Sequence, residues 1–254
     1  MHIKVLGWSG GIGGELRTTC FQIDDDLLID AGTGLGDLPL PRMTGIRHVF
    51  LTHSHMDHIA GLPLLADSMF GVHEEPIVVH ALEKTIKALK AHIFNWVIWP
   101  DFSELPNKDK PCIRFQPMQP GEKLRIGDRE IEMIPVNHTV PGVGYCIRSP
   151  EAVVAFSGDT TTNDSLWQRL NAYDRLDLLF VESAFAEDDL EISRISKHYC
   201  PSLLAKDLAK LRHRPQIWLT HFKPGEEDLI YRECQQALPD FSLNRLSGGE
   251  LFTL

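Results

Sequence analysis

The feature that most constrains this chain is a six-residue stretch with three histidines and one aspartate: His53, His55, Asp57 and His58. The short apolar run at residues 49–51 is typical of a buried strand, and the apolar residues after the stretch have helical spacing. The four polar side chains are therefore expected on a turn between a strand and a helix. Imidazole nitrogen and carboxylate oxygen are ligands that Zn²⁺, Mn²⁺ and Fe accept in common. One metal ion does not need four side chains this crowded, so the stretch predicts two adjacent metal ions.

The same stretch contains a complete His-x-His-x-Asp-His motif, and in this the chain resembles the metallo-β-lactamase superfamily. The resemblance implies an α+β fold: an αββα sandwich of two mixed sheets with helices on both outer faces. It also implies a dinuclear metal site at one edge of the sheets, with the remaining ligands later in the chain. Three residues at the ends of apolar strand-like runs meet this expectation in the expected order: His138, Asp159 and His221.

The ligand set implied by the resemblance divides into two groups joined by one carboxylate. One metal ion is assigned His53, His55 and His138, the other is assigned Asp57, His58 and His221, and both share Asp159. Asp30 lies in an Asp-Ala-Gly element that resembles an early element of the superfamily, and it is expected to support the metal-binding loop rather than to bind metal. We expect Zn²⁺, with Mn²⁺ or Fe as alternatives, because an all-His/Asp ligand set suits hydrolysis by these ions.

Two metal ions about 3.5–4 Å apart would hold a hydroxide between them and clamp the oxygens of a phosphodiester. Asp57 would orient this nucleophile while binding metal. The leaving oxygen then needs a proton, and His198 has a pKa range suited to donating one near neutral pH. Glu182, at the end of an apolar run, would hold the other imidazole nitrogen. This Glu-then-His pattern resembles the phosphodiesterase branch of the superfamily, whereas His198 alone could simply begin the following helix.

Across most of its length the chain resembles the class II 3′,5′-cyclic-nucleotide phosphodiesterases, which implies hydrolysis of cyclic AMP or cyclic GMP to the nucleoside monophosphate. The segments that carry this resemblance are residues 10–11, 52–61, 94–95, 99–100, 157–160, 181–183 and His198. Residues 94–102 hold two Trp and two Phe in a stretch without clean periodicity. Trp96 and Trp99 either form an aromatic wall that stacks on a nucleobase or pack into the core.

Other functions stay open from the sequence alone. A tRNA 3′-processing nuclease shares the Glu182/His198 pattern, but the formal net charge of −10 and the short stretch between these two residues disfavour a nucleic-acid partner. Another small phosphodiester, or an aryl phosphate or sulfate ester, is an alternative substrate. A non-catalytic metal-dependent carrier on the same fold would not need a proton donor such as His198. Hydrolysis of a β-lactam or a thioester would not require the Glu182/His198 pair.

Composition and organisation favour a cytoplasmic enzyme with a single domain, residues 1–254. No apolar run approaches the length of a membrane span, and the N-terminus lacks the apolar core of a signal peptide. Five scattered cysteines without a Cys-x-x-Cys pair favour free thiols in a reducing compartment. The expected partner is a small anionic phosphodiester. No membrane partner is expected, and a homodimer stays open.

Periodicity and turn residues predict the individual elements. Strands are expected at residues 2–7, 19–23, 27–32, 77–80, 113–118, 123–126, 129–135, 144–147, 152–157, 178–181, 217–220 and 250–254. Helices are expected at residues 82–93, 165–170, 201–211 and 226–237. The acidic run at residues 24–26 suggests a solvated hairpin tip, and the glycine-rich residues 7–14 form either a flexible connection or a loop at the rim of the site.

Overall fold

The computed structural model describes residues 1–254. One group of strands comprises β1 (His2–Gly7), β2 (Cys20–Ile23), β3 (Leu27–Ile29), β4 (His48–Phe50), β5 (Ile77–Leu82), β6 (Ile113–Met118) and β14 (Leu251–Thr253). A second group comprises β7 (Lys123–Ile126), β8 (Arg129–Val136), β9 (Gly142–Arg148), β10 (Val153–Phe156), β11 (Leu178–Glu182), β12 (Gln216–Thr220) and β13 (Leu243–Arg245). The helices are α1 (Leu40–Met43), α2 (Met56–Ile59), α3 (Gly61–Ser68), α4 (Glu83–His92), α5 (Ser165–Leu170), α6 (Leu190–Ser196), α7 (Pro201–Leu208) and α8 (Glu227–Ala237), with 3₁₀ turns η1 (Thr33–Asp37) and η2 (Glu187–Asp189).

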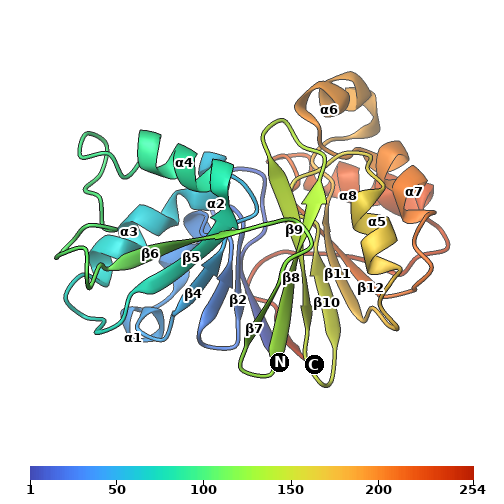
Figure 1. Cartoon of the computed structure of the whole chain (residues 1–254). Coiled ribbons are helices and arrows are strands. Elements are labelled where there is room, and N and C mark those ends of the chain that lie inside the picture. The colour runs from blue at the N-terminus through green and yellow to red at the C-terminus, as the bar shows by residue number, and fades with distance from the viewer.

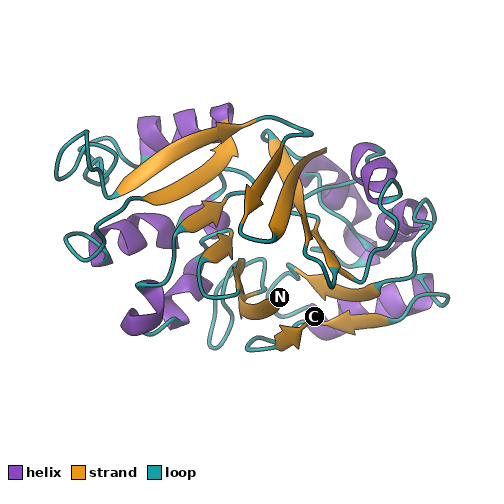
Figure 2. Cartoon of the chain, turned by 60° about the horizontal axis from the view of Figure 1, so that its bottom comes forward, coloured by secondary structure: helices purple, strands orange, loops and turns teal.

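The strands form two seven-stranded mixed sheets packed face to face. The strand order is β14-β1-β2-β3-β4-β5-β6 in the first sheet and β13-β12-β11-β10-β9-β8-β7 in the second. Helices cover the outer side of each sheet, with α3 and α4 on the first and α5, α7 and α8 on the second (Figures 1 and 2). This four-layer arrangement confirms the predicted αββα sandwich.

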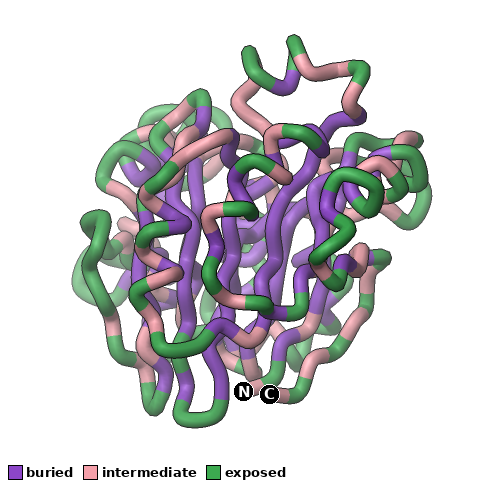
Figure 3. Tube along the Cα trace, turned by 90° about the vertical axis from the view of Figure 1, so that its right-hand side faces the viewer, coloured by how far each residue is buried: buried purple, intermediate pink, exposed green.

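Alternation of side chains along the strands explains the layers. In β4, Val49 packs in the apolar cluster under the helices of the first sheet, whereas its neighbour Phe50 points into the cluster between the sheets. In that central cluster the rings of Phe21, Phe156 and Phe180 lie 5.0–5.1 Å apart. Burying each such ring contributes about 2 kcal/mol. Figure 3 shows the buried strands running through the middle of the molecule.

Strand direction determines where functional side chains can gather. Strands β3 to β6 are parallel to one another, and so are β10, β11 and β12, so their carboxyl ends meet at one edge of the sandwich. The end of β1 joins this edge, because the Trp8 carbonyl accepts a hydrogen bond from the His221 amide at 2.6 Å. The chain termini lie together at the opposite edge (Figure 1).

Most predicted elements are present within one or two residues, and the strands at 113–118 and 123–126 and the helix at 165–170 have the predicted bounds. Five short elements were not predicted: α1, α6, β13 and the turns η1 and η2. The five cysteines are free and buried. None of the helices combines the length and apolar composition that crossing a bilayer would require.

Candidate metal centre

Seven His and Asp side chains meet at the edge where the parallel strands of both sheets end. The first sheet supplies four of them from the turn after β4 and the start of α2, and the second supplies three from the loops after β8, β10 and β12. The members, called the cluster below, are His53, His55, Asp57, His58, His138, Asp159 and His221. The structure thus brings together all seven residues that the sequence analysis nominated as metal ligands.

Asp159 lies at the centre of the cluster and is almost completely buried, with 3% of its surface exposed. Its Oδ2 atom is 3.6 Å from the Nε2 atom of His53. The same oxygen is 3.3 Å from Nε2 of both His58 and His221. These neighbours hold the pKa of Asp159 well below its ordinary value, although burial alone would raise it. The carboxylate is therefore charged and faces imidazoles from both sheets.

The cluster divides into two groups of possible ligand atoms that share Asp159. In one group His53, His55 and His138 join Asp159, and in the other Asp57, His58 and His221 join it; within each group the ligand atoms lie within 4.8 Å of one another. In the first group, Nε2 of His138 is 3.2 Å from Nδ1 of His55. In the second, Oδ2 of Asp57 is 3.4 Å from Nε2 of His58. This division is the one that the family resemblance implied.

The protein alone does not satisfy the buried nitrogen atoms of this cluster. Nε2 of His53 and Nε2 of His58 are inaccessible to solvent and have no partner in hydrogen-bonding geometry, although Oδ2 of Asp159 lies 3.3 Å from the second atom. Unpaired buried polar atoms of this kind cost about 1–3 kcal/mol each. Burial lowers the pKa of His53 well below its ordinary value, so its imidazole is neutral and has a free lone pair. The donor set and its unpaired nitrogens fit a divalent cation.

Asp30 holds one end of the cluster without entering it. Its carboxylate accepts hydrogen bonds from the Thr52 amide at 2.7 Å and the Thr52 hydroxyl at 2.8 Å. It also lies 2.6 Å from Nδ1 of His58, which directs the Nε2 atom of His58 toward Asp159. Burial alone would lower the pKa of His58, but the carboxylates of Asp159 and Asp30 raise it well above its ordinary value. A cation bound by His58 must displace that proton, so its affinity should weaken as the pH falls.

A second polar pair stands next to the cluster. Glu182, at the end of β11, is 1% exposed, and its Oε1 atom lies 2.8 Å from Nδ1 of His198. The same carboxylate accepts hydrogen bonds from the backbone amides of Thr160, Ala184 and Tyr199. The His198 ring lies 4.9 Å from that of His138 and stacks on that of His221 at 5.3 Å. His198 is therefore fixed beside the cluster with one nitrogen free.

Glu182 also controls the charge of His198. Burial alone would lower the pKa of His198, but the carboxylate of Glu182 and its hydrogen bond raise it to about 9. His198 is then a charged imidazolium at neutral pH, with its Nδ1 proton held by Glu182. Such a group can donate a proton to a neighbouring leaving group.

The two tryptophans nominated for substrate binding are not among the contacts of the cluster. Trp99 packs against the helix-side core of the first sheet, and its indole nitrogen donates to the Pro63 carbonyl at 3.1 Å. Trp96 is 59% exposed in a tight loop and has a positive φ of 63°. These contacts support the packing alternative for Trp99, and the stacking role of both residues stays a prediction.

Alanine substitutions separate these two roles. Trp99→Ala is expected to destabilise the fold by about 3 kcal/mol, as truncation of a packed aromatic ring does, and to leave the KM for a nucleotide unchanged. Urea unfolding and steady-state kinetics provide the two measurements. A rise in KM without a loss of stability would contradict the packing role. Trp96→Ala serves as the exposed comparison, with little expected change in the free energy of unfolding.

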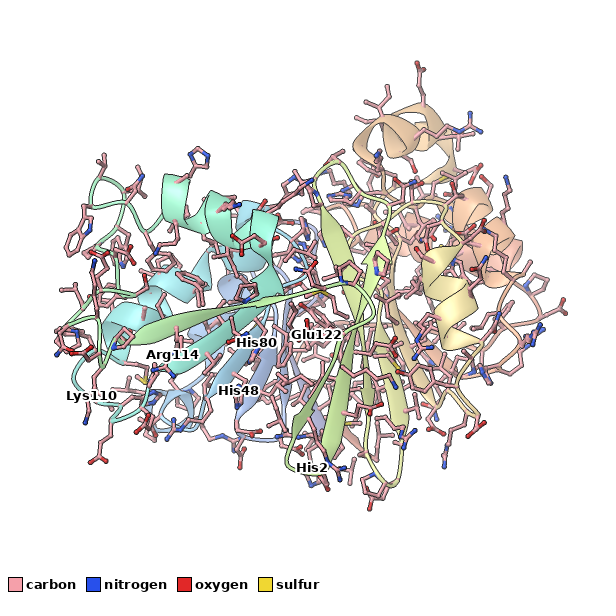
Figure 4. The ribbon with its side chains drawn as sticks, viewed as in Figure 1. His2, His48, His80, Lys110, Arg114 and Glu122 are labelled. Carbon is pink, nitrogen blue, oxygen red and sulfur yellow. The ribbon has the colours of Figure 1, made fainter.

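Two further histidines show that a buried histidine near the motif need not belong to the cluster. His48 on β4 and His80 on β5 lie side by side on the strands (Figure 4), with Nδ1 of His48 3.0 Å from Nε2 of His80. Burial, reinforced by His48, lowers the pKa of His80 to about 3. The imidazole of His80 is therefore neutral. It also stacks on the ring of Phe50 at 4.3 Å, so the two histidines are part of the packing between the strands.

The sequence analysis did not predict that Lys197 is a neighbour of the cluster, and it left the role of the glycine-rich residues 7–14 open. The carbonyl of Lys197 lies 3.0 Å from Nδ1 of His138, and the only sequence signal for this contact is that Lys197 precedes His198. The glycine-rich residues 7–14 reach the rim of the site: a Cβ atom on Gly10 would lie 2.7 Å from the His221 carbonyl. The close approach of backbone to backbone there explains the glycine.

Comparisons with known proteins agree with the fold and the cluster. A probable 3′,5′-cyclic-nucleotide phosphodiesterase of Yersinia pestis is 25% identical over 292 residues, covering 92% of this chain and 83% of the relative. A ribonuclease Z of Haloarcula marismortui is 25% identical, covering 87% and 86%. The solved structure of unliganded yeast PDE1 is 18% identical with a TM-score of 0.83, covering 100% of this chain and 99% of that one. These relatives are hydrolases, and together with the cluster they confirm the prediction of an enzyme.

Family membership follows from the sequence as well as from the fold. A family model described as a β-lactamase superfamily domain matches residues 26–222, which include all seven members of the cluster and the Glu182/His198 pair. A metallo-β-lactamase fold protein, YhfI from Bacillus subtilis, aligns with a TM-score of 0.77 at 21% identity, covering 99% of this chain and 98% of that one. The chain belongs to the metallo-β-lactamase superfamily.

Proposed function

We propose that this protein is a metal-dependent phosphodiesterase that hydrolyses 3′,5′-cyclic nucleotides to nucleoside monophosphates. The observation that carries the proposal is the buried Glu182–His198 pair beside a cluster divided by Asp159 into two groups. Two divalent cations, most simply Zn²⁺, with Mn²⁺ or Fe as alternatives, would be held by those groups. When bound, such cations polarise phosphate oxygens and lower the pKa of an attacking water.

The side chains of this chain supply the proton transfers. Hydrolysis adds water across one P–O bond: the water oxygen joins phosphorus, one ribose oxygen leaves, and the proton that the water loses passes to solvent. His198 donates its free-nitrogen proton to that leaving oxygen, while Glu182 holds the opposite nitrogen and orients the ring. Of the two carboxylates of the cluster, Asp57 is the more open to solvent, with a side chain 30% exposed against 3% for Asp159, and it orients the water.

Charge and shape support a small substrate over a polynucleotide. The chain carries a formal net charge of −10, which opposes the approach of an RNA backbone. Between Glu182 and His198 the chain forms only η2 and the seven-residue α6, which is too short for an RNA-binding arm. The relative named as a cyclic-nucleotide phosphodiesterase aligns over 92% of this chain. A tRNA 3′-processing activity is the second candidate, because ribonuclease Z aligns over a similar share.

The test is turnover of cyclic AMP and cyclic GMP by metal-loaded protein, with an aryl phosphodiester and a pre-tRNA 3′ end in parallel. Hydrolysis of a cyclic nucleotide that a chelator abolishes is the expected result. Activity on the aryl ester alone would keep the phosphodiesterase and remove the cyclic-nucleotide assignment. Cleavage of the pre-tRNA would favour the second candidate, and no turnover at full metal occupancy would favour a carrier.

Glu182→Gln is expected to change the pH dependence of turnover. His198 must be protonated to act as the acid, so the kcat of the parent should fall as the pH rises through about 9. Without the Glu182 carboxylate, the pH above which kcat falls should move toward the ordinary histidine pKa. At pH 8 only about 3% of the imidazole would then be protonated, so kcat should fall about 30-fold. A pH–rate profile measures the shift. Glu191→Gln, at an exposed position on α6, is the control, and an alkaline limit that stays near 9 in Glu182→Gln would contradict this role.

A further inference from the structure

Lys197, the residue between α6 and His198, has an unusual backbone conformation. It is the C-cap of α6 and has φ 56° and ψ 52°, in the left-handed region. Glycine is preferred at such positions because a Cβ atom crowds the neighbouring backbone there. A lysine that persists in a strained conformation next to a candidate site is a reason to ask what its side chain contributes.

Two hydrogen bonds in opposite directions join Lys197 to His138. The Lys197 carbonyl accepts from Nδ1 of His138 at 3.0 Å, and the Lys197 ammonium donates to the His138 carbonyl at 3.1 Å. A carbonyl can only accept, so the first bond requires the proton of His138 to be on Nδ1. The lone pair of Nε2 then points toward the cluster, where that atom lies 3.2 Å from Nδ1 of His55.

The residue after Lys197 is the proton donor, His198, and its backbone is bonded to Ser193 of α6. The amide of His198 donates to the Ser193 carbonyl at 3.0 Å, and the hydroxyl of the fully buried Ser193 donates to the His198 carbonyl at 2.8 Å. Figures 1 and 3 show α6 standing above the rest of the molecule, and the segment is held at its base by the bonds of Lys197 to His138 and of His198 to Glu182. Its position depends on its base, where Lys197 lies.

We propose that Lys197 is a positioning residue that couples cation binding at His138 to the placement of His198. The proposal rests on the proposed metal-dependent function, because it assigns His138 to the cation and His198 to the leaving group. Lys197 is hydrogen-bonded to His138 and directly precedes His198 in the chain, so a cation that orders His138 also restrains the segment that carries His198. Coupling of this kind is reciprocal: loss of the Lys197 bond weakens cation binding and also misplaces the proton donor.

Three substitutions test the proposal. Lys197→Gly removes the ammonium and relieves the backbone strain, Lys197→Met removes only the charge, and Lys197→Arg keeps a donor. Lys206→Met, at an exposed position on α7, is the control. The readouts are Zn²⁺ affinity by chelator competition, the Tm of the metal-free protein, and kcat and KM for cyclic AMP and an aryl phosphodiester.

We expect Lys197→Gly to have an equal or higher Tm without metal and yet to bind Zn²⁺ about tenfold more weakly, the low end for loss of a group that supports a ligand. Lys197→Met should show the same loss of affinity, and Lys197→Arg should restore most of it. The kcat should fall in the first two variants with KM unchanged. Parent-like Zn²⁺ affinity in Lys197→Gly and Lys197→Met would overturn the proposal. A rise in KM alone would also overturn the proposal, because it would indicate that the Lys197 ammonium binds the substrate.

Hydrogen exchange provides a readout that needs no substrate. Zn²⁺ should slow amide exchange at residues 190–198 in the parent and in Lys206→Met, and this protection should be lost in Lys197→Met. Because affinity and exchange are measured without turnover, they test Lys197 even if no cyclic nucleotide is hydrolysed. Zn²⁺-induced protection that persists in Lys197→Met would show that His138 and His198 are not coupled through Lys197.

Discussion

Asp159→Ala is expected to abolish metal binding and turnover together. Asp159 is the residue common to both groups of the cluster, and its buried Oδ2 atom faces three imidazoles at 3.3–3.6 Å. Its removal takes a negative charge from both groups at once and leaves His53, His58 and His221 facing one another without it. Affinity should fall more than about 100-fold, beyond the loss typical for groups that only support a ligand.

The measurements for this variant are metal content after dialysis, by elemental analysis, and kcat/KM for an activated phosphodiester. Turnover should fall by at least about 10³-fold, since each cation supplies several kcal/mol of transition-state stabilisation. Asp164→Ala is a matched control: it lies five residues further along the chain, its side chain is 72% exposed, and its one side-chain hydrogen bond is to Lys210. Normal metal content in folded Asp159→Ala would overturn the shared-ligand assignment.

His198→Ala is expected to keep the metal ions but to lose proton donation. No member of the cluster depends on a His198 side-chain hydrogen bond, because that side chain bonds only to Glu182. The kcat for a cyclic nucleotide, whose alkoxide is a poor leaving group, should fall by roughly 10²–10⁴. An aryl phosphodiester releases a stabilised phenolate and should be affected much less.

The ratio of these two losses is the informative quantity. Steady-state kinetics on both substrates, with metal content measured on the same samples, provides it. His92→Ala, at an exposed position at the end of α4, is the control for the loss of a histidine. An equal loss of kcat on both substrates would instead give His198 a role in binding the phosphate.

The metal-binding residues could be found in the sequence because of where they lie on strands. Apolar runs that end in His or Asp, such as the one before Asp159, identify carboxyl ends of buried strands, and parallel strands bring such ends to one edge. The two-sheet fold was implied by the family resemblance that the His-x-His-x-Asp-His motif carries. Long apolar strands were located well because burial dictates both their composition and their length.

What the sequence did not show depends on contacts between distant residues. The acidic turn at residues 24–26 looked solvated, yet Asp24 and Asp26 accept hydrogen bonds at 2.7–3.0 Å from Arg129, a buried residue more than a hundred positions away. Helix α6 has two exposed isoleucines, Ile192 and Ile195, so its pattern does not indicate a buried face. The left-handed backbone of Lys197 has no signature in residue type at all.

The division of the cluster between the two sheets has a consequence for the stability of the whole sandwich. His53, His55, Asp57 and His58 belong to one half of the chain, and His138, Asp159 and His221 belong to the other. A cation held by either group would therefore act as a cross-link between the halves. Far above its Kd it would stabilise the folded state, by about 2.7 kcal/mol at a hundredfold excess. Chelation would then loosen this edge, while Arg129 still joins the halves at the edge beside the termini.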